Sequence, residues 1–165
     1  MIPTFTEEHI ALREEVRKTV QEKVIPRAAE VDVTDEYPYD VRKVFADRGY
    51  YGMFVPKQYG GQGGDFTSAC ILIEEVAKGS AGCAQMVYSA SSIAAATILF
   101  CNEEQKARLY PATASGEKLI GFAMTEPNAG SDIMGIEATA VREGDHYILN
   151  GTKTWTSGAG FWNSW

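Results

Sequence analysis

Positive charge is scarce in this chain. Lysine and arginine number 15 against 22 acids, the formal net charge is −7, and no run of basic residues occurs. Proteins that bind nucleic acid neutralise phosphates with clustered lysine and arginine, so this composition argues against a nucleic-acid partner. Long apolar runs are missing too. The longest, residues 93–101, is too short to span a bilayer, and no membrane span is expected.

Cysteine and histidine are too few, and too irregularly spaced, for several common sites. Cys70, Cys83 and Cys101 form no CxxC pair, which favours buried thiols in a reducing compartment over a disulfide framework. His9 and His146 lack the HxxxH or HExxH spacing of a zinc site, so no metal is expected. The opening residues, MIPTFTEEH, resemble neither a signal peptide nor a transit peptide. A cytoplasmic location is therefore expected.

The first two-thirds of the chain has the apolar spacing of helices. Thr6 is placed to cap a first helix, and Glu7 and Glu8 then lie at the positive end of its dipole. Apolar residues recur at every fourth position behind that cap: Leu12, Val16, Val20 and Val24. Pro26 is expected to end or bend this helix, because proline lacks the amide hydrogen that the helix needs.

Two further helices flank a glycine-rich stretch. Residues 40–48 predict a short helix, and Gly49 falls where a left-handed cap belongs. The sequence GGQGG, residues 60–64, lacks the GK[ST] of a phosphate loop and is interpreted as a tight turn between helices. Residues 66–78 predict the next helix, with Glu74 and Glu75 on a solvated face. Its inward positions are expected to be Ile71, Leu72, Val76 and Ala77.

A buried helix and a capped helix complete this part. Residues 84–100 are apolar almost all round, as expected of a central helix. Asn102 and Gln105 have the spacing of a capping box and open a helix through about Ala114, which Ser115 and Gly116 then stop.

The apolar period changes after Gly116, and the rest of the chain has the pattern of strands. Residues 119–124 are a candidate strand. Residues 137–142 and 146–154 predict a hairpin around Gly144 and Asp145. The sequence therefore predicts an α+β protein, with an all-helical domain over residues 1–117 and a partial β domain over residues 118–165. So few residues cannot close a barrel, and the β architecture is therefore expected to be incomplete. The final FWNSW also leaves three aromatic residues uncovered: Phe161, Trp162 and Trp165.

Two segments of the β domain carry most of the chemical information. GFAMTEPNAGSDIMG, residues 121–135, leaves the candidate strand and enters a turn rich in exposed amide groups. Such a loop suits the carbonyl and nitrogen edge of a planar heterocycle, or it is a plain strand-to-turn connection. NGTKTWTSGAG, residues 150–160, begins with a turn signal and places Trp155 on the strand that follows. This indole is expected either to stack on an aromatic ligand or to lie in a sheet core.

Together these segments resemble a known enzyme family. TEPNAGSD, residues 125–132, resembles the TEPxAGSD signature of acyl-CoA dehydrogenases, and NGTKTWTSGAG is similar to their NGxKxWITN segment. QYGGQGGD, residues 58–65, resembles the family's YGGxG loop. The resemblance covers essentially the whole chain. It implies an all-helical N-terminal domain, a β-barrel-like middle domain and a C-terminal helical bundle, of which the last has no counterpart in this sequence.

The resemblance also assigns a cofactor and site residues. FAD is implied, with its isoalloxazine ring against Phe122, Ala123, Met124 and Thr125. Ser131 would touch both FAD and the acyl-CoA thioester, so it is also the expected substrate residue. Trp155 would lie against the flavin, with Thr156 and Ser157 following it.

Four positions in these segments depart from the family pattern. Thr156, Ser157 and Gly158 stand where the family has isoleucine, threonine and asparagine. Ser157 keeps the hydroxyl that reaches flavin N5 in the family but lacks the methyl group that restricts its rotamer. Phe122 stands where tyrosine is frequent, and a hydroxyl is lost there.

The implied reaction is FAD-dependent α,β-dehydrogenation of an acyl-CoA thioester. It needs a carboxylate base for a poorly acidic α-proton. The family's base comes from the C-terminal domain, and no residue here matches it, although Glu74, Glu75 and Glu126 are candidates by type. The chain is therefore expected to be inactive alone. An electron-transfer flavoprotein is the implied acceptor, and a homo-oligomer or a missing C-terminal half the implied assembly.

Two alternatives stay open beside this enzyme. One is a non-catalytic subunit or remnant that contributes half of a flavin and acyl-CoA site to a partner chain. The other is a truncated product that misfolds.

Overall fold

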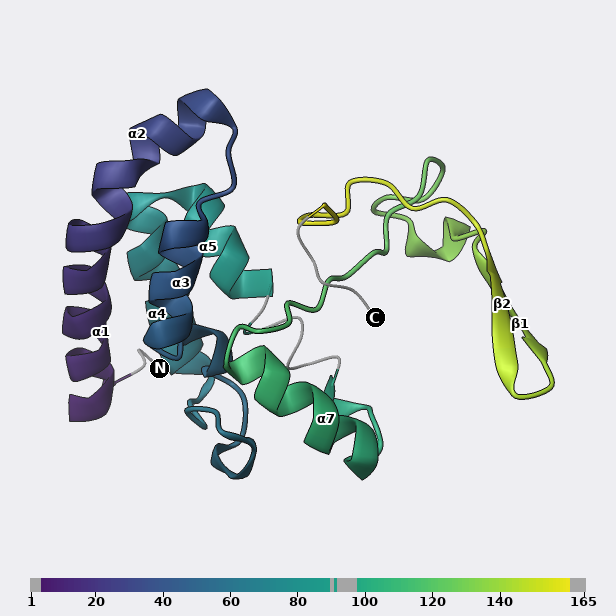
Figure 1. Cartoon of the computed structure of the whole chain (residues 1–165), viewed down its shortest axis with the longest axis horizontal. Helices are drawn as coiled ribbons and strands as arrows, with labels where there is room; N and C mark the ends of the chain where they lie inside the picture. Colours follow the sequence, from purple (N-terminus) through teal and green to yellow (C-terminus); the bar gives the residue numbers. More distant parts are fainter. Residues whose placement is uncertain (1–3, 90, 92–97, 161–165) are drawn as a thin grey trace. The chain divides into compact units, whose positions relative to one another are not determined.

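The computed structural model describes residues 4–89, 91 and 98–160. The chain separates into two compact units, a helical unit that runs to Ile120 and a β unit that begins at Gly121 (Figure 1). The fold is mostly helical at first and then contains a two-stranded antiparallel sheet, which confirms the predicted α+β class. Among the helices described, none is both long and apolar enough to cross a membrane.

The first helix is capped as predicted. α1 (Glu7–Thr19) begins with a capping box, in which the His9 amide donates to Thr6 Oγ1 and the Thr6 amide donates to His9 Nδ1, both over 3.2 Å. Val16, Val20 and Val24 are buried, which confirms most of the predicted stripe.

Pro26 bends this helix rather than ending it. The turn before the proline widens into a π-helix, η1 (Val20–Val24), and the chain continues as α2 (Ile25–Thr34). A wider turn accommodates a residue that cannot donate to the turn below. Figure 1 shows α2 leaning away from the axis of α1.

The glycine-rich stretch folds back between two helices, as predicted. α3 (Tyr39–Asp47) ends at Gly49, which has the left-handed φ of +70° that its position demands. After η2 (Tyr50–Gly52) and η3 (Lys57–Tyr59), the Gln62 amide donates to Gly52 O over 2.9 Å. A Cβ on Gly61 would lie 2.0 Å from Val55 O, so the loop closes only because this residue is glycine.

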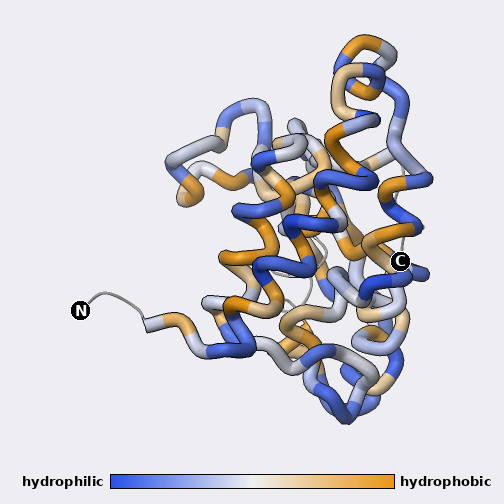
Figure 2. The backbone as a smooth tube through the Cα atoms, turned by 90° about the vertical axis from the view of Figure 1, so that its left-hand side faces the viewer, coloured by the Kyte–Doolittle hydropathy of each residue, from blue (hydrophilic) through white to orange (hydrophobic). Residues whose placement is uncertain are grey.

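α4 (Phe66–Gly79) packs against α1 and against α5 (Ala81–Tyr88). Figure 2 shows apolar and polar residues alternating around the helical turns. Ile71 and Leu72 are buried as predicted, but Ala77 is exposed and the expectation for it is wrong. Of the predicted helix 84–100, residues 90 and 92–97 lie outside the described residues.

Glu75 is a buried acid, so the solvated face predicted for it is wrong. Its side chain is 2% exposed. Its carboxylate accepts from Arg17 Nε and Nη2 over 3.1 and 3.0 Å and from Lys78 Nζ over 2.7 Å. The bonds from Arg17 lower the pKa of Glu75, and they outweigh the burial that would raise it. Glu74 behaves as predicted: it is 61% exposed, and among the described residues its ion pair is with Lys78.

The last helix of the unit is also capped as predicted. α7 (Glu103–Ala114) begins with a capping box between Asn102 and Gln105 and stops at Gly116, whose φ is +71°. Tyr110 and Ala114 on its inner face pack with Val55 and Ile98.

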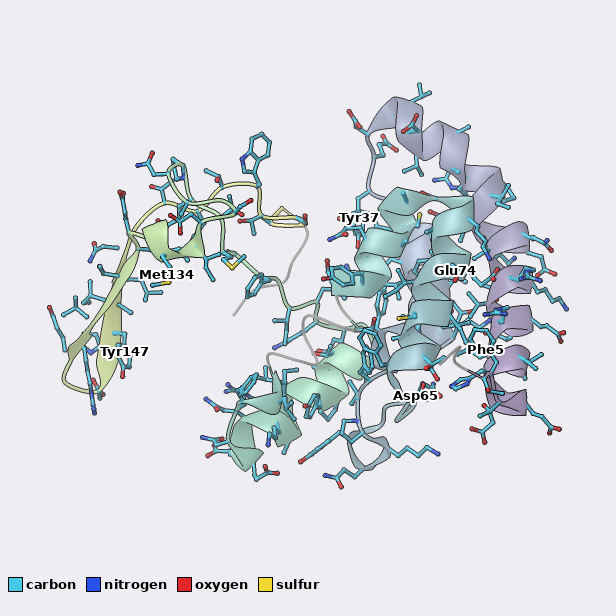
Figure 3. All side chains as sticks on the ribbon, turned by 180° about the vertical axis from the view of Figure 1, so that it is seen from behind. Phe5, Tyr37, Asp65, Glu74, Met134 and Tyr147 are labelled. Carbon is cyan, nitrogen blue, oxygen red and sulfur yellow. The ribbon has the colours of Figure 1, made fainter. Side chains whose placement is uncertain are left out.

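The predicted hairpin forms in the β unit. β1 (Thr139–Glu143) and β2 (His146–Asn150) pair antiparallel, with Glu143 opposite His146 across the turn at Gly144, whose φ is +65°. The second strand is shorter than the predicted 146–154, and every residue of both strands is exposed. In Figure 3, Tyr147 stands on this hairpin.

Two other expectations for the β unit are wrong. Residues 119–124 form no strand ladder with any described residue. Asn150 and Gly151 make no hairpin turn. Instead, Gly151 has φ +149° and lets the chain pass Ala138, whose Cβ would lie 2.6 Å from a side chain there. The turn signal in the sequence therefore marks a close approach of two backbones.

Candidate functional site

Two segments far apart in the sequence lie side by side in the β unit. The Thr154 amide donates to Thr125 O over 2.8 Å. Lys153 Nζ donates to the neighbouring carbonyl, Met124 O, over 2.9 Å. The structure thus brings Met124 and Thr125 next to the segment that leads into Trp155. The fold of the β unit therefore creates one part of the predicted site, namely the contact between residues 124–125 and residues 153–154.

The 122–125 edge, meaning the backbone of residues 122–125, has two occupied carbonyls and amides that donate to no described residue. The carbonyls of Met124 and Thr125 are both used, as above. The amide groups of residues 122–125 donate to no described residue. An edge of this kind is complementary to a ligand edge that carries several acceptors.

Trp155 stands out by its backbone and by its exposure. It has φ +55°, and its side chain is 90% exposed. A bulky residue in the left-handed region is strained, and such strain gathers at ligand sites. The indole lies in no core of described residues, so the sheet-core alternative is wrong, and Trp155 sits beyond the end of the strand rather than on it. An exposed indole can cover an aromatic ligand.

The remaining predicted residues are exposed, except Thr156, which is partly buried, and they are less closely tied to this edge. Phe122 is 50% exposed, and Ala123 is exposed beside it. Thr156 O accepts from the Ala159 amide over 3.2 Å, which closes a turn behind Trp155. Ser157 is an exposed residue within that turn, and no described residue bonds its side chain.

Ser131 lies in a bend before η5 (Ile133–Gly135), the short helix that carries Met134 in Figure 3. It is exposed, and among the described residues no bond connects its side chain to the 122–125 edge.

Glu126 and Lys153 are site residues that the sequence did not single out as a pair. Lys153 Nζ lies 2.8 Å from Glu126 Oε1. The same carboxylate accepts from the Glu137 amide over 2.7 Å and from the Ala138 amide over 3.1 Å. The bond from Lys153 lowers the pKa of Glu126. The sequence shows an acid in TEPNAGSD and a lysine in NGTKTWTSGAG. The two form an ion pair only because the fold brings these motifs together.

The acids proposed by type as bases are all engaged in the structure. Glu75 is enclosed by Arg17 and Lys78, Glu126 by Lys153 and two amides, and Glu74 pairs with Lys78. A base must be able to take up a proton near neutral pH, and the pKa values of Glu75 and Glu126 are shifted the opposite way. Among the residues described, no three His, Cys, Asp or Glu side chains cluster as metal ligands.

Known protein families and individual proteins resemble this chain. The model of the acyl-CoA dehydrogenase N-terminal domain matches residues 6–117, and that of the acyl-CoA dehydrogenase middle domain matches residues 121–165. A 3-(aryl)acrylate reductase of Clostridium sporogenes is 38% identical over 156 residues, which is 94% of this chain and 41% of the relative. The chain thus spans about two-fifths of that relative's length.

Solved structures agree with these matches. A glutaryl-coenzyme A dehydrogenase in complex with glutaryl-CoA superposes with a TM-score of 0.90 at 38% identity, over 98% of this chain and 42% of that one. An acyl-CoA dehydrogenase of Bacillus anthracis complexed with FAD gives a TM-score of 0.87 at 32% identity, over 96% of this chain and 28% of that one.

Proposed function

The chain belongs to the acyl-CoA dehydrogenase family, and on that premise we propose that it forms the flavin-contacting part of an FAD-dependent dehydrogenase of acyl-CoA thioesters. The observation that carries the proposal is the 122–125 edge, where the carbonyls of Met124 and Thr125 are occupied and the amides donate to no described residue. The pyrimidine side of a flavin presents carbonyl and nitrogen acceptors in one plane. The residues present therefore fit the group.

Each residue of the site has a defined task in this proposal. Met124 and Thr125 donate their amides to the ring edge, and Thr125 adds a hydroxyl donor. Trp155 covers the ring and excludes water from it, as an exposed indole on a strained backbone is suited to do. Ser131 and Ser157 offer hydroxyls that no described residue occupies, with Ser131 also reaching the thioester.

The bound FAD would accept a hydride from the β-carbon of the thioester. The proton at the α-carbon needs a carboxylate, and we place that base outside the described residues because Glu74, Glu75 and Glu126 are all engaged. From the family we further propose that an electron-transfer flavoprotein is the electron acceptor. We also propose that the assembly is a homo-oligomer or a complex with a complementing helical half, and that the protein lies in the cytoplasm.

Residue-resolved titration tests this function. Flavin mononucleotide added to the ¹⁵N-labelled chain should shift the amide signals of Met124 and Thr125 and the indole signal of Trp155. Adenosine diphosphate, which carries the other half of FAD, should leave these signals in place. Binding is expected to be weak, because one chain covers only part of a flavin. Absence of any shift at these positions at millimolar flavin would refute the proposed function.

A further inference from the structure

Lys153 holds one particular peptide group of the 122–125 edge. Its ammonium lies 2.9 Å from Met124 O and 2.8 Å from Glu126 Oε1, so a single cation bridges the backbone of one residue and the side chain of another two positions further on. The side chain of Lys153 is 30% exposed and that of Glu126 only 4%, so the pair is partly shielded from water. The contact is therefore stronger than a surface pair would be.

Glu126 fixes the lysine in this place. Its carboxylate is held by the amides of Glu137 and Ala138, and its own backbone pairs with Ala129, amide to carbonyl in both directions over 3.0 and 3.2 Å. Three separate stretches of the β unit thus meet at one carboxylate. These bonds fix the Glu126 carboxylate, and the carboxylate in turn holds the ammonium of Lys153. The ammonium therefore has little freedom to leave Met124 O.

The carbonyl of Met124 and the amide of Thr125 belong to the same peptide group. A cation that bonds the oxygen withdraws electron density from the nitrogen, and hydrogen bonds in a chain polarise one another in this way. The Thr125 amide donates to no described residue, so the polarised donor remains available to a ligand.

We propose that Lys153 is a positioning and polarising residue for the flavin edge: its ammonium makes the Thr125 amide a stronger donor to the flavin ring, and Glu126 holds the ammonium in place. The proposal rests on the proposed function, because it takes the ligand to be a flavin. Both residues then do more than join two segments of the β unit: together they strengthen the Thr125 amide as a hydrogen-bond donor.

The test uses the whole ¹⁵N-labelled chain and four variants. Lys153→Met removes the cation, Lys153→Gln keeps a donor without charge, and Lys153→Arg keeps the charge. Lys43→Met is the matched control, because Lys43 forms an exposed i,i+4 pair with Asp47 in α3.

Two readouts separate the inference from the proposed function. Without ligand, the Thr125 amide proton should move upfield in Lys153→Met and Lys153→Gln but stay within a small shift of the wild type in Lys153→Arg and Lys43→Met. With flavin mononucleotide, the dissociation constant should rise about fivefold or more in the two uncharged variants only. Failure of the wild-type chain to bind the flavin would refute the proposed function, whereas flavin binding with an unmoved Thr125 proton in Lys153→Met would refute the inference and leave the proposed function standing.

Three results would overturn the inference. One is an unmoved Thr125 proton in a folded Lys153→Met chain. Another is equal flavin affinity in wild type and uncharged variants. The third is collapse of the β1–β2 hairpin signals in both uncharged variants, which would show that the lysine only supports the fold.

Discussion

At the scale of single residues, Thr125 carries the most direct prediction. Thr125→Ala removes a hydroxyl donor from the proposed flavin site but leaves the backbone bond from Thr154 in place. Loss of one hydrogen bond whose partner stays desolvated costs about 1–3 kcal/mol, so flavin affinity should fall about fivefold or more. Isothermal titration with flavin mononucleotide measures it. Unchanged affinity and an unchanged flavin spectrum would remove the Thr125 hydroxyl from the site.

Trp155 carries the second prediction at this scale. Its exposed indole should lie on the flavin, so flavin should quench a part of the tryptophan fluorescence. Trp162 and Trp165 also emit, so the comparison with Trp155→Phe is required. The quenched component should be absent in the variant, and equal quenching in both proteins would argue against stacking.

At the scale of elements, Glu75 on α4 is bonded to Arg17 on α1 and joins the two helices. Glu75→Gln should lower the free energy of unfolding at pH 7 by about 1–2 kcal/mol, the low part of the range for charged hydrogen bonds, because the Arg17 and Lys78 heads are half exposed. Urea titration followed by circular dichroism measures this loss. Glu74→Gln, one residue away on the exposed face, is the matched control and should change little.

The same element has a predictable dependence on pH. The folded pKa of Glu75 is lowered, so its contribution is fully present above the unfolded value of about 4.3 and is lost as pH falls through the folded value. The stability difference between wild type and Glu75→Gln should therefore shrink below about pH 4. A difference that stays constant from pH 7 to pH 3 would show that the bonds from Arg17 do not depend on the ionised carboxylate.

The sequence predicted those elements whose signals are local. The capping boxes at Thr6 and Asn102, the left-handed Gly49 and the hairpin turn at Gly144 all formed, because each depends on a few neighbouring residues. Burial of Glu75 was missed, because its cationic partner Arg17 lies 58 residues away along the chain. The strand predicted over 119–124 failed for a related reason, since apolar spacing predicts an extended segment but does not supply a partner.

The candidate site, too, was predictable only where its signals are local. The motifs pointed to Thr125 and Trp155, but two features needed the folded chain: the strained backbone of Trp155 and the pairing of Lys153 with Glu126. The pair arises from contact between residues 27 positions apart, which no single motif encodes, and the left-handed φ of Trp155 is a backbone state that residue spacing does not predict.

At the scale of the whole molecule, the chain alone should show no acyl-CoA oxidation. A general base contributes roughly 10²–10⁴-fold to such reactions, and the three candidate carboxylates are engaged. Acyl-CoA-dependent dye reduction after gel filtration is the assay. Robust turnover by the monodisperse chain would contradict this prediction and require a base among Glu74, Glu75 and Glu126. Turnover restored by adding the remaining part of a related enzyme would favour a split enzyme over a non-catalytic remnant.

The central claim is that these residues carry a working flavin-contacting surface, and a chimera tests it most directly. This chain would replace the matching segment of the glutaryl-coenzyme A dehydrogenase whose structure it resembles, which is 42% of that protein. The measurement is the flavin content of the purified, monodisperse chimera by visible absorbance, beside the same chimera with Thr125→Ala. We predict a yellow protein that retains stoichiometric FAD through gel filtration and retains less of it in the variant. A folded, monodisperse chimera without flavin would contradict the account.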